Sequence, residues 1–309
     1  MEVARLSEDE ARAMFRTLRF ADTDGKPVCP YCACDAVVEF RCRPIFKCKG
    51  CERQFSVTSG TLFASRKLPF RDIMMAVAVF VNGANGVSAL RMSRELGRCY
   101  KTAFVLLHKL REAMGTMKVD RKLTGTVEID GVWVGGHIKK ANEAAGRKDM
   151  RVSNPKRASV VVMRERRPGG RTLTFKVKHE KDAVEAVLEH VDPSASIRTD
   201  EASHWIRLHA YFDDVKTINH KHRYAEKGGV HTNWAESFNS RLRRAERGVH
   251  HRISGQYLDA YAQEFAWRED FRRVDTGRQF ASLLRSAGVT AVSRRWAGYW
   301  QRLPDAVAA

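Results

Sequence analysis

The stretch TGTVEIDGVWVGG, residues 124–136, decides the fold of this chain of 309 residues. Its apolar residues alternate with other side chains between flanking glycines, a pattern that predicts a β-strand. ASVVVMRE (158–165) and TLTFKVK (172–178) continue the β pattern, with a PGG turn between them. Three such strands in succession are typical of a β-meander.

The segments after this meander alternate between helix and strand. We expect a helix over about 181–190, a strand at SIRTD (196–200), a helix at ASHWIRLHAYF (202–212), a strand at DVKTINH (214–220) and a helix within GGVHTNWAESFNSRLRR (228–244). The order β-β-β-α-β-α-β-α predicts an α/β domain with a mixed sheet over residues 120–273.

The charge balance indicates a polyanionic partner. Lys and Arg number 55 against 36 Asp and Glu, which gives a net charge of +19 and a pI near 9.9. Such a field favours nucleic acid over a small neutral substrate. The N-terminal residues lack the apolar region of a signal peptide, and the longest apolar run, IMMAVAVFV (73–81), is shorter than the ~20 residues that span a bilayer. We therefore expect a cytoplasmic protein with no membrane contact.

Six of the seven cysteines lie within residues 29–51, which in a chain without an export signal indicates metal rather than disulfides. The pairs CPYC and CKGC, separated by 15 residues, offer four thiolates, which suit tetrahedral zinc. The predicted Zn²⁺ ligands are Cys29, Cys32, Cys48 and Cys51. Cys34 and Cys42 remain outside this set as small apolar residues, and a group of reduced cysteines without metal is the alternative.

Short β patterns around the cysteine pairs predict a zinc ribbon. An amphipathic helix that starts at a capping box of Ser7 and Glu10 precedes it, in a domain of residues 1–68. Residues 69–119 follow, where SALRMSRELG and CYKTAFVLLHKLREAM predict two helices joined by a short turn. The pair is similar to a helix-turn-helix, with Lys101 of the second helix as a DNA contact, and an ordinary helical hairpin is the alternative.

Three carboxylates lie on different elements of the predicted α/β domain. Asp130 lies in the first strand, Asp200 ends the fourth, and Glu236 lies in the first turn of the helix after the fifth. Carboxylates that converge repel one another unless cations lie between them, and hard oxygen ligands suit Mg²⁺ or Mn²⁺. Two such ions would activate a nucleophile and stabilise the leaving oxygen at a phosphodiester.

Each of these acids also has a structural interpretation. Glu236 follows Asn233 by three residues, the spacing of a capping box. Asp200 has the position of an N-cap, and Glu201 beside it is a rival ligand. Asp130 is harder to explain in this way, because a carboxylate between apolar strand residues is costly to bury without a partner.

Polar and basic residues follow Glu236 on the same predicted helix. We predict that they hold the DNA backbone, because guanidinium groups match phosphate oxygens, and a solvated basic face is the alternative. The predicted contacts are Asn239, Arg241, Arg243, Arg244 and Arg247. Residues 274–309 are read as a basic C-terminal tail.

Taken together, CPYC…CKGC, VEIDGVWVGGH, IRTDEASHW and the segment from KHRYAEKGG to AWRED resemble bacterial insertion-sequence transposases of the DDE class, in the zinc-ribbon-bearing ISXO-like group. The resemblance covers nearly the whole chain. It implies a ribonuclease-H-like catalytic core in which Asp130, Asp200 and Glu236 are the metal-binding triad. It also implies that the zinc ribbon and the helix-turn-helix recognise element ends.

The resemblance implies an enzyme that cuts and joins double-stranded DNA, at element ends and at a target, as a homo-oligomer assembled on DNA. One position departs from the pattern, since many relatives carry an acid after the first catalytic Asp, where this chain has Gly131. Two alternatives remain: a metal-dependent nuclease of the same fold that does not join strands, and a zinc-ribbon DNA-binding regulator without catalysis.

Overall fold

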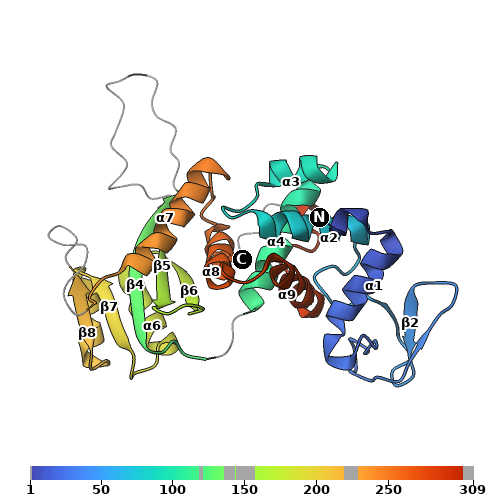
Figure 1. Ribbon diagram of the computed structural model, residues 1–309, viewed down its shortest axis with the longest axis horizontal. Helices are drawn as coiled ribbons and strands as arrows, with labels where there is room; N and C mark the ends of the chain where they lie inside the picture. The colour runs from blue at the N-terminus through green and yellow to red at the C-terminus, as the bar shows by residue number, and fades with distance from the viewer. Residues whose placement is uncertain (1, 118–120, 136–142, 144–156, 219–228, 302–309) are drawn as a thin grey trace. The chain divides into compact units, whose positions relative to one another are not determined.

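The computed structural model describes residues 2–117, 121–135, 143, 157–218 and 229–301 (Figure 1). The chain divides into two compact units. One consists of Met1–Lys118 together with Val274–Ala309, and the other is Val119–Arg273. The second unit is therefore an insertion between two segments of the first.

A five-stranded sheet is the centre of the inserted unit. It contains β4 (Thr126–Gly135), β5 (Arg157–Glu165), β6 (Thr172–Val177), β7 (Ser196–Asp200) and β8 (Val215–Ile218). The spatial order is β6-β5-β4-β7-β8, in which β4, β5 and β6 are antiparallel neighbours while β7 and β8 run parallel to β4. The predicted mixed α/β core, with its antiparallel meander first, is confirmed.

Both faces of this sheet are covered by helices, and β4 contributes to both cores. On one face, Val132 and Val162 pack against Phe238 of α7 (Asn233–Gly248) and against α8 (Leu258–Phe271). On the other face, apolar residues that include Ile129 pack against η4 (Glu180–Ala183), α6 (Val184–His190) and η5 (Ser203–Ala210). The alternation along β4 therefore decides which side chains lie next to α7.

Element η5 differs from its prediction as an α-helix over 202–212. It is a 3₁₀ helix of eight residues whose two buried side chains are Trp205 and Leu208. Residues three apart share one side of a 3₁₀ helix, so this winding directs both side chains into the core.

The other unit begins with η1 (Glu2–Arg5), α1 (Glu8–Arg19) and η2 (Ala21–Thr23), and the predicted capping box of Ser7 and Glu10 is present. A three-stranded antiparallel sheet follows, with β1 (Val37–Glu39), β2 (Ile45–Cys48) and β3 (Gln54–Ser56). Three helices come next, α2 (Phe70–Asn82), α3 (Ala89–Leu96) and α4 (Tyr100–Thr116). Gly97, with φ 59°, ends α3 shortly before α4 begins, which gives the predicted short turn.

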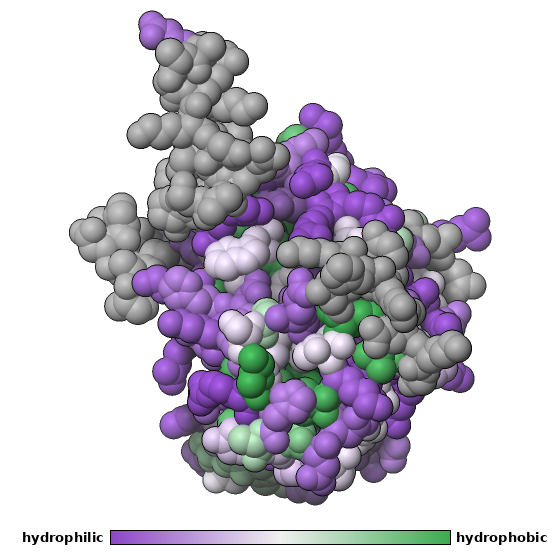
Figure 2. All heavy atoms as spheres, turned by 90° about the vertical axis from the view of Figure 1, so that its left-hand side faces the viewer, coloured by the Kyte–Doolittle hydropathy of each residue, from purple (hydrophilic) through white to green (hydrophobic). Residues whose placement is uncertain are grey.

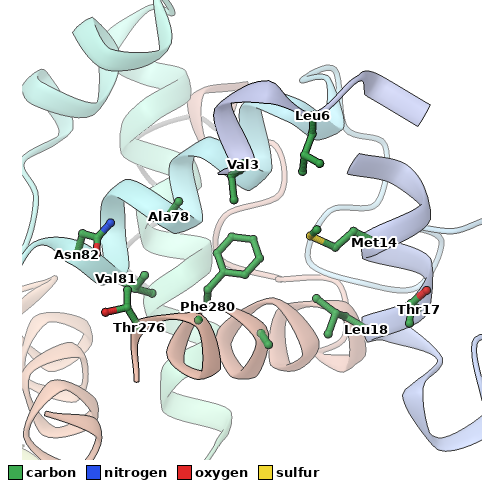
Figure 3. A pocket seen from close by; sticks show the side chains of 12 residues that line it. Val3, Leu6, Met14, Thr17, Leu18, Ala78, Val81, Asn82, Thr276 and Phe280 are labelled. Atoms are coloured by element: carbon green, nitrogen blue, oxygen red, sulfur yellow. The ribbon is translucent and has the colours of Figure 1, made fainter. Parts of the chain in front are cut away.

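The C-terminal segment is more than the basic tail that the sequence predicted. Helix α9 (Thr276–Val289), capped by Asp275, packs on α1, α2 and α4 and buries Leu283 and Leu284. A short 3₁₀ turn, η6 (Tyr299–Gln301), follows. An apolar pocket of about 630 Å³ lies between α1, α2 and α9, and Phe280 of α9 points into it (Figure 3).

Candidate active site and metal centre

The four cysteines predicted as zinc ligands lie together. Their sulfur atoms are all within 4.8 Å of one another, with 3.6 Å between Cys29 and Cys51 and 3.6 Å between Cys32 and Cys48. A tetrahedral ion with Zn–S bonds of ~2.3 Å places its sulfurs about 3.8 Å apart. The cluster therefore has the donor set and the spacing that zinc requires.

The backbone of the two turns explains this spacing. Ala33 and Glu52 each follow the second cysteine of a pair, and both adopt left-handed φ angles, 57° and 60°. In the second turn, N–H groups of Cys51 and Gly50 point at the Cys48 sulfur and lower the pKa of that thiol to about 6. Such N–H donors stabilise the thiolate form, which is the form that binds metal.

Asp130 lies on β4 and is one of the three predicted carboxylate ligands, Asp130, Asp200 and Glu236, which we call the acidic cluster. Glu128 of β4 pairs with Arg198 of the parallel strand β7, an offset of 70 residues, and the same offset separates Asp130 from Asp200. Burial, the charge of Asp200 and that of Glu236 together raise the pKa of Asp130 to about 7. The structure thus brings the three predicted carboxylates into one electrostatic environment, in which a cation would offset the repulsion.

Two hydrogen bonds hold the Asp130 carboxylate in place. Oδ1 accepts from the N–H of Gly131 at 2.8 Å, and Oδ2 accepts from the side-chain amide of Asn239 on α7, also at 2.8 Å. Each oxygen keeps a lone pair for a metal ion. Among the described residues, the four thiolates lie close enough together to share one ion, whereas Asp130, Asp200 and Glu236 do not form so close a group.

Glu128 attaches helix α7 to the sheet and was missed by the sequence analysis. Its fully buried carboxylate lies on the same side of β4 as Asp130, two residues earlier. Oε2 accepts from the N–H groups of Trp234 at 2.7 Å and Ala235 at 3.1 Å, in the first turn of α7. Glu128 therefore satisfies two N-terminal donors of α7. The N–H of Asn233, which the predicted capping box would pair with Glu236, donates instead to His231 Nδ1 at 3.4 Å.

Arg166 completes this attachment. Its Nε donates to Glu128 Oε1 at 2.7 Å, and its two terminal nitrogens donate to the carbonyls of Gly229 and His231, just before α7. The guanidinium neutralises the buried acid and fixes the chain that leads into the helix. In consequence, Glu236 and Asn239 are carried on a helix whose start is fixed to the strand that carries Asp130.

The residues predicted to contact DNA have different environments. Asn239 is buried and binds Asp130, so it belongs to the acidic cluster and not to an exposed DNA surface as the sequence predicted. Arg241 is partly buried and pairs with Glu269 of α8. Three others are exposed on α7, namely Arg243, Arg244 and Arg247, and Lys101 is exposed on α4. Hydrophilic side chains also make up much of the coloured surface in Figure 2, with apolar ones between them.

The departure at Gly131 has a steric explanation. A Cβ atom at this position would lie 2.5 Å from the carboxyl group of Glu180 in η4. Glu180 in turn accepts a hydrogen bond from Ser159 of β5 at 3.3 Å. Because side chains alternate along a strand, this contact lies on the face of β4 opposite to Asp130. Glycine leaves the room that the Glu180 side chain fills.

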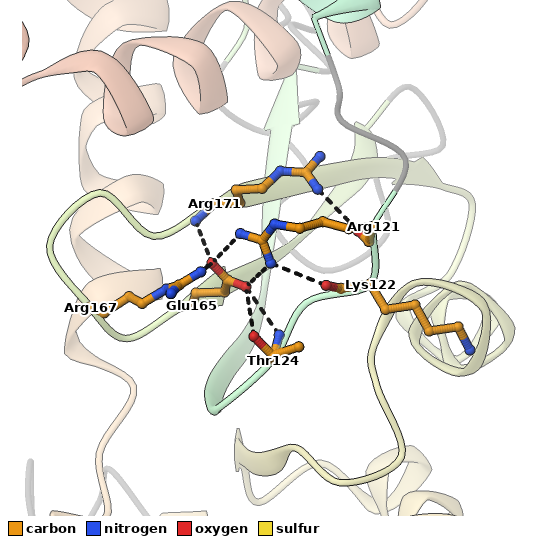
Figure 4. Close-up of polar contacts among 6 residues, drawn as sticks. All are labelled: Arg121, Lys122, Thr124, Glu165, Arg167 and Arg171. Carbon is orange, nitrogen blue, oxygen red and sulfur yellow. Dashed lines mark hydrogen bonds and ion pairs between the residues drawn. The ribbon is translucent and has the colours of Figure 1, made fainter.

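A second buried glutamate, Glu165, is the last residue of β5 and fixes that end of the strand (Figure 4). Its carboxylate accepts two hydrogen bonds from Arg121, at 2.7 and 3.0 Å, and others from Arg167 and from the N–H groups of Thr124 and Arg171. Although burial opposes it, these donors lower the pKa of Glu165 to about 2. All of its partners lie in the segments that flank β4 and β5, so this network stabilises the sheet at a distance from Asp130.

Comparison with known proteins gives two matches to protein-family models. Residues 122–270 match the ISXO2-like transposase domain. Residues 6–54 match the transposase zinc-ribbon domain, which spans the four cysteines. Residues 122–270 are thus an ISXO2-like transposase domain. The recognition made from the sequence motifs is thus confirmed.

A relative from a mobile element is similar to this chain along most of its length. It is described as an uncharacterized protein in transposable element ISH50 of Halobacterium salinarum, and it is 24% identical over 279 residues. The alignment covers 84% of this chain and 90% of the relative. Within the described part of the chain, no helix is both long and apolar enough to cross a membrane.

Proposed function

We propose that this protein is a DNA transposase that binds the ends of an insertion sequence, cleaves DNA strands there and transfers them to a target. The observation that carries the proposal is the environment of Asp130. Burial and two neighbouring carboxylates raise its pKa to about 7, in the centre of a domain that matches a transposase model. A strongly perturbed acid with specific charge partners is typical of a functional site.

In this proposal Asp130, Asp200 and Glu236 hold Mg²⁺ or Mn²⁺. The bound ions supply Lewis-acid chemistry, which activates a water or a 3′-hydroxyl and stabilises the leaving oxygen. Asn239 contributes by orienting one oxygen of Asp130, and Glu128 contributes by fixing the start of α7. The four thiolates of the ribbon hold Zn²⁺ in a closed site, which has a structural role because no position is open for water.

The DNA would be held by exposed cations. Arg243 and Arg244 on α7 can pair with backbone phosphates, and Lys101 on α4 can do so in the other unit. We further propose that the zinc ribbon and the α3–α4 pair recognise element ends, and that the protein works in the cytoplasm as a homo-oligomer assembled on DNA.

A cleavage and joining assay tests the function. The substrate is a labelled duplex made from the DNA that flanks the reading frame, with a supercoiled plasmid as target and Mg²⁺ or Mn²⁺ present. We expect end-specific cleavage followed by covalent joining of the label to the plasmid. Cleavage without joined product would favour the nuclease alternative, and binding with neither reaction would favour the regulator.

A further inference from the structure

A groove in the N-terminal unit was not assigned by the sequence motifs. It is formed by the first half of α4, by residues 63–68 after the ribbon and by residues 296–300, and its volume is about 910 Å³. We call it the α4 groove. Its volume lies in the range of ~300–1,000 Å³ that is usual for ligand sites.

The lining of the α4 groove is basic. It contains five cationic residues and, among the described residues, no acidic one; the cations are Arg66, Lys67, Arg98, Lys101 and Lys109. Three of them have an acid nearby outside the groove, since Arg98 pairs with Asp72 at 2.7 Å, Arg66 lies 3.8 Å from Glu8, and the charge of Glu112 acts on Lys109. In the described part of the chain, no ion pair is found for Lys67 or Lys101. The groove therefore attracts an anion.

One wall of the same groove is aromatic. Trp296 is buried and stacks on His108 with ring centres 4.2 Å apart, which gives the wall a rigid base. Tyr299 packs on Trp296 at 5.0 Å, and Trp300 contacts Phe104 at 6.0 Å. Trp300 nevertheless remains 45% exposed, and Lys101 Nζ lies 5.2 Å from its ring centre. An indole surface and an ammonium group thus stand together in the groove.

This combination favours one ligand chemistry. Cations that follow a phosphate backbone, next to an aromatic ring on which a base can stack, are the elements of single-stranded nucleic acid binding. Bases inside a duplex already stack on one another, so they have no free face with which to stack on the Trp300 ring. We propose that the α4 groove binds an unpaired stretch of DNA, with a base stacked on Trp300 and its phosphate near Lys101. The choice of DNA as the polymer rests on the proposed function.

A binding experiment tests this inference. Fluorescence anisotropy compares a labelled oligothymidylate of eight nucleotides with a duplex of equal length, using the full chain without added Mg²⁺ or Mn²⁺. Trp300→Ala should weaken binding of the single strand about 10- to 100-fold, because stacking on an aromatic ring carries that much affinity. Trp300→Phe should keep most of the affinity, and duplex binding should change less than about twofold for either variant.

Two further variants make the result specific. Tyr211→Ala removes an aromatic side chain of similar exposure, 54%, from the other unit and should leave single-strand binding unchanged. Lys101→Gln should lower the salt dependence of single-strand binding by about 0.7, the contribution of one phosphate contact. The inference is overturned if Trp300→Ala binds the oligothymidylate as wild type does, or loses single-strand and duplex binding equally.

The outcome is separable from that of the cleavage and joining assay. Oligothymidylate binding is measured without divalent metal and needs no intact triad. A protein that fails to cleave or join DNA can still show Trp300-dependent binding. Conversely, active cleavage with no effect of Trp300→Ala on single-strand binding would contradict the proposed role of the groove and leave the proposed function intact.

Discussion

The four sulfur atoms of the zinc ribbon lie on two short turns, whereas the carboxylates of the acidic cluster lie on two strands and a helix. In the ribbon the atoms already have the spacing of a tetrahedral site, and N–H groups stabilise a thiolate. In the acidic cluster, burial and mutual repulsion raise the pKa of Asp130 to about 7. The first arrangement has the spacing for an ion that would form part of the fold; the second carries an electrostatic cost that bound cations would relieve.

The largest expected effect is on chemistry. Asp130→Asn, Asp200→Asn and Glu236→Gln each remove one charge but keep the size of the side chain, so fold and DNA binding should persist while cleavage falls by several orders of magnitude. Each single change should cost nearly as much as all three together, because the groups act as a unit. The measurement is cleavage of the labelled end duplex, with the exposed neighbour variant Glu201→Gln as the active control. If Glu201→Gln is inactive and Glu236→Gln is active, Glu236 has been misassigned.

Changes in the zinc ribbon should affect metal content and DNA binding, whereas changes in the acidic cluster should affect cleavage. Cys29→Ser or Cys48→Ser should release about one zinc per chain and weaken end-specific binding strongly, because metal binding and folding of so small a module are coupled. The exposed Cys42 lies outside the cluster, so Cys42→Ser should keep its zinc. Atomic absorption gives the metal content. Unchanged zinc in Cys48→Ser would show that the ligand set is wrong.

Glu128 is not one of the predicted metal ligands, but it fixes the start of the helix that carries Glu236 and Asn239. Glu128→Gln should reduce cleavage about 10- to 100-fold, as is usual for residues that orient metal ligands. It should also lower the free energy of unfolding by about 3 kcal/mol, since a buried pair is broken. Glu165→Gln breaks a comparable buried pair in the same unit and serves as the matched control.

The readout for this pair is cleavage per folded molecule. We expect both variants to lose stability and only Glu128→Gln to lose activity under conditions in which both are folded. Equal losses of activity would mean that Glu128 acts only through the stability of the sheet.

The pKa of Asp130 predicts an unusual pH dependence of stability. Its folded pKa of about 7 lies above the ordinary value of ~3.9, so its contribution to folding is complete below about pH 4 and is lost as the pH rises to 7. Without metal, Asp130→Asn should therefore be more stable than wild type at pH 8, by up to about 4 kcal/mol, and by less at pH 5. Urea unfolding at the two pH values measures the difference.

Asp270 provides the control for that experiment. Burial also raises its pKa to about 7, but the neighbours that oppose this shift are Thr172, Arg164 and Arg171, and neither Asp200 nor Glu236 contributes to it. Asp270→Asn should show a similar pH dependence. Only Asp130→Asn should abolish stabilisation by Mg²⁺, and a variant that still gains stability from Mg²⁺ would place the metal elsewhere.

The smallest effect concerns the cationic face of α7. Changing the exposed Arg243 and Arg244 together to Ala should lower the salt dependence of duplex binding by about two units, roughly 0.9 for each phosphate contact. Arg241→Ala should change it less, because that guanidinium is engaged by Glu269. The slope of log affinity against log salt is the measurement. An unchanged slope in the double variant would assign these arginines to a solvated surface.

The sequence predicted best what is encoded locally. The spacing CPYC and CKGC sets two turns, and alternation within TGTVEIDGVWVGG sets a strand that carries Asp130. The role of Glu128 was not predictable in the same way, because its partners, Trp234 and Ala235, lie more than one hundred residues later. The pattern VEID did contain a signal, since residues two apart on a strand share a face.

Two other differences have the same origin in distant contacts. Asn239 was assigned to DNA from its place among arginines, yet its position on α7 turns it towards Asp130. The segment after residue 273 was assigned to a tail from its charge, yet α9 buries leucines against α1, α2 and α4. Composition alone could not reveal which helix face finds an apolar partner.

The insertion of one unit into the other has a consequence for the order of synthesis. Helix α9, which covers α1, α2 and α4, is translated after the whole inserted unit. At ~5–20 residues per second, the ribosome needs roughly 10–30 s to pass from the end of the first segment to α9. During this interval the inserted unit can fold while the unit around it still exposes the apolar surface that α9 will cover. A polypeptide released before α9 is translated would contain the acidic cluster but lack the helix that completes the N-terminal unit. That unit can therefore reach its final structure only after α9 has been translated.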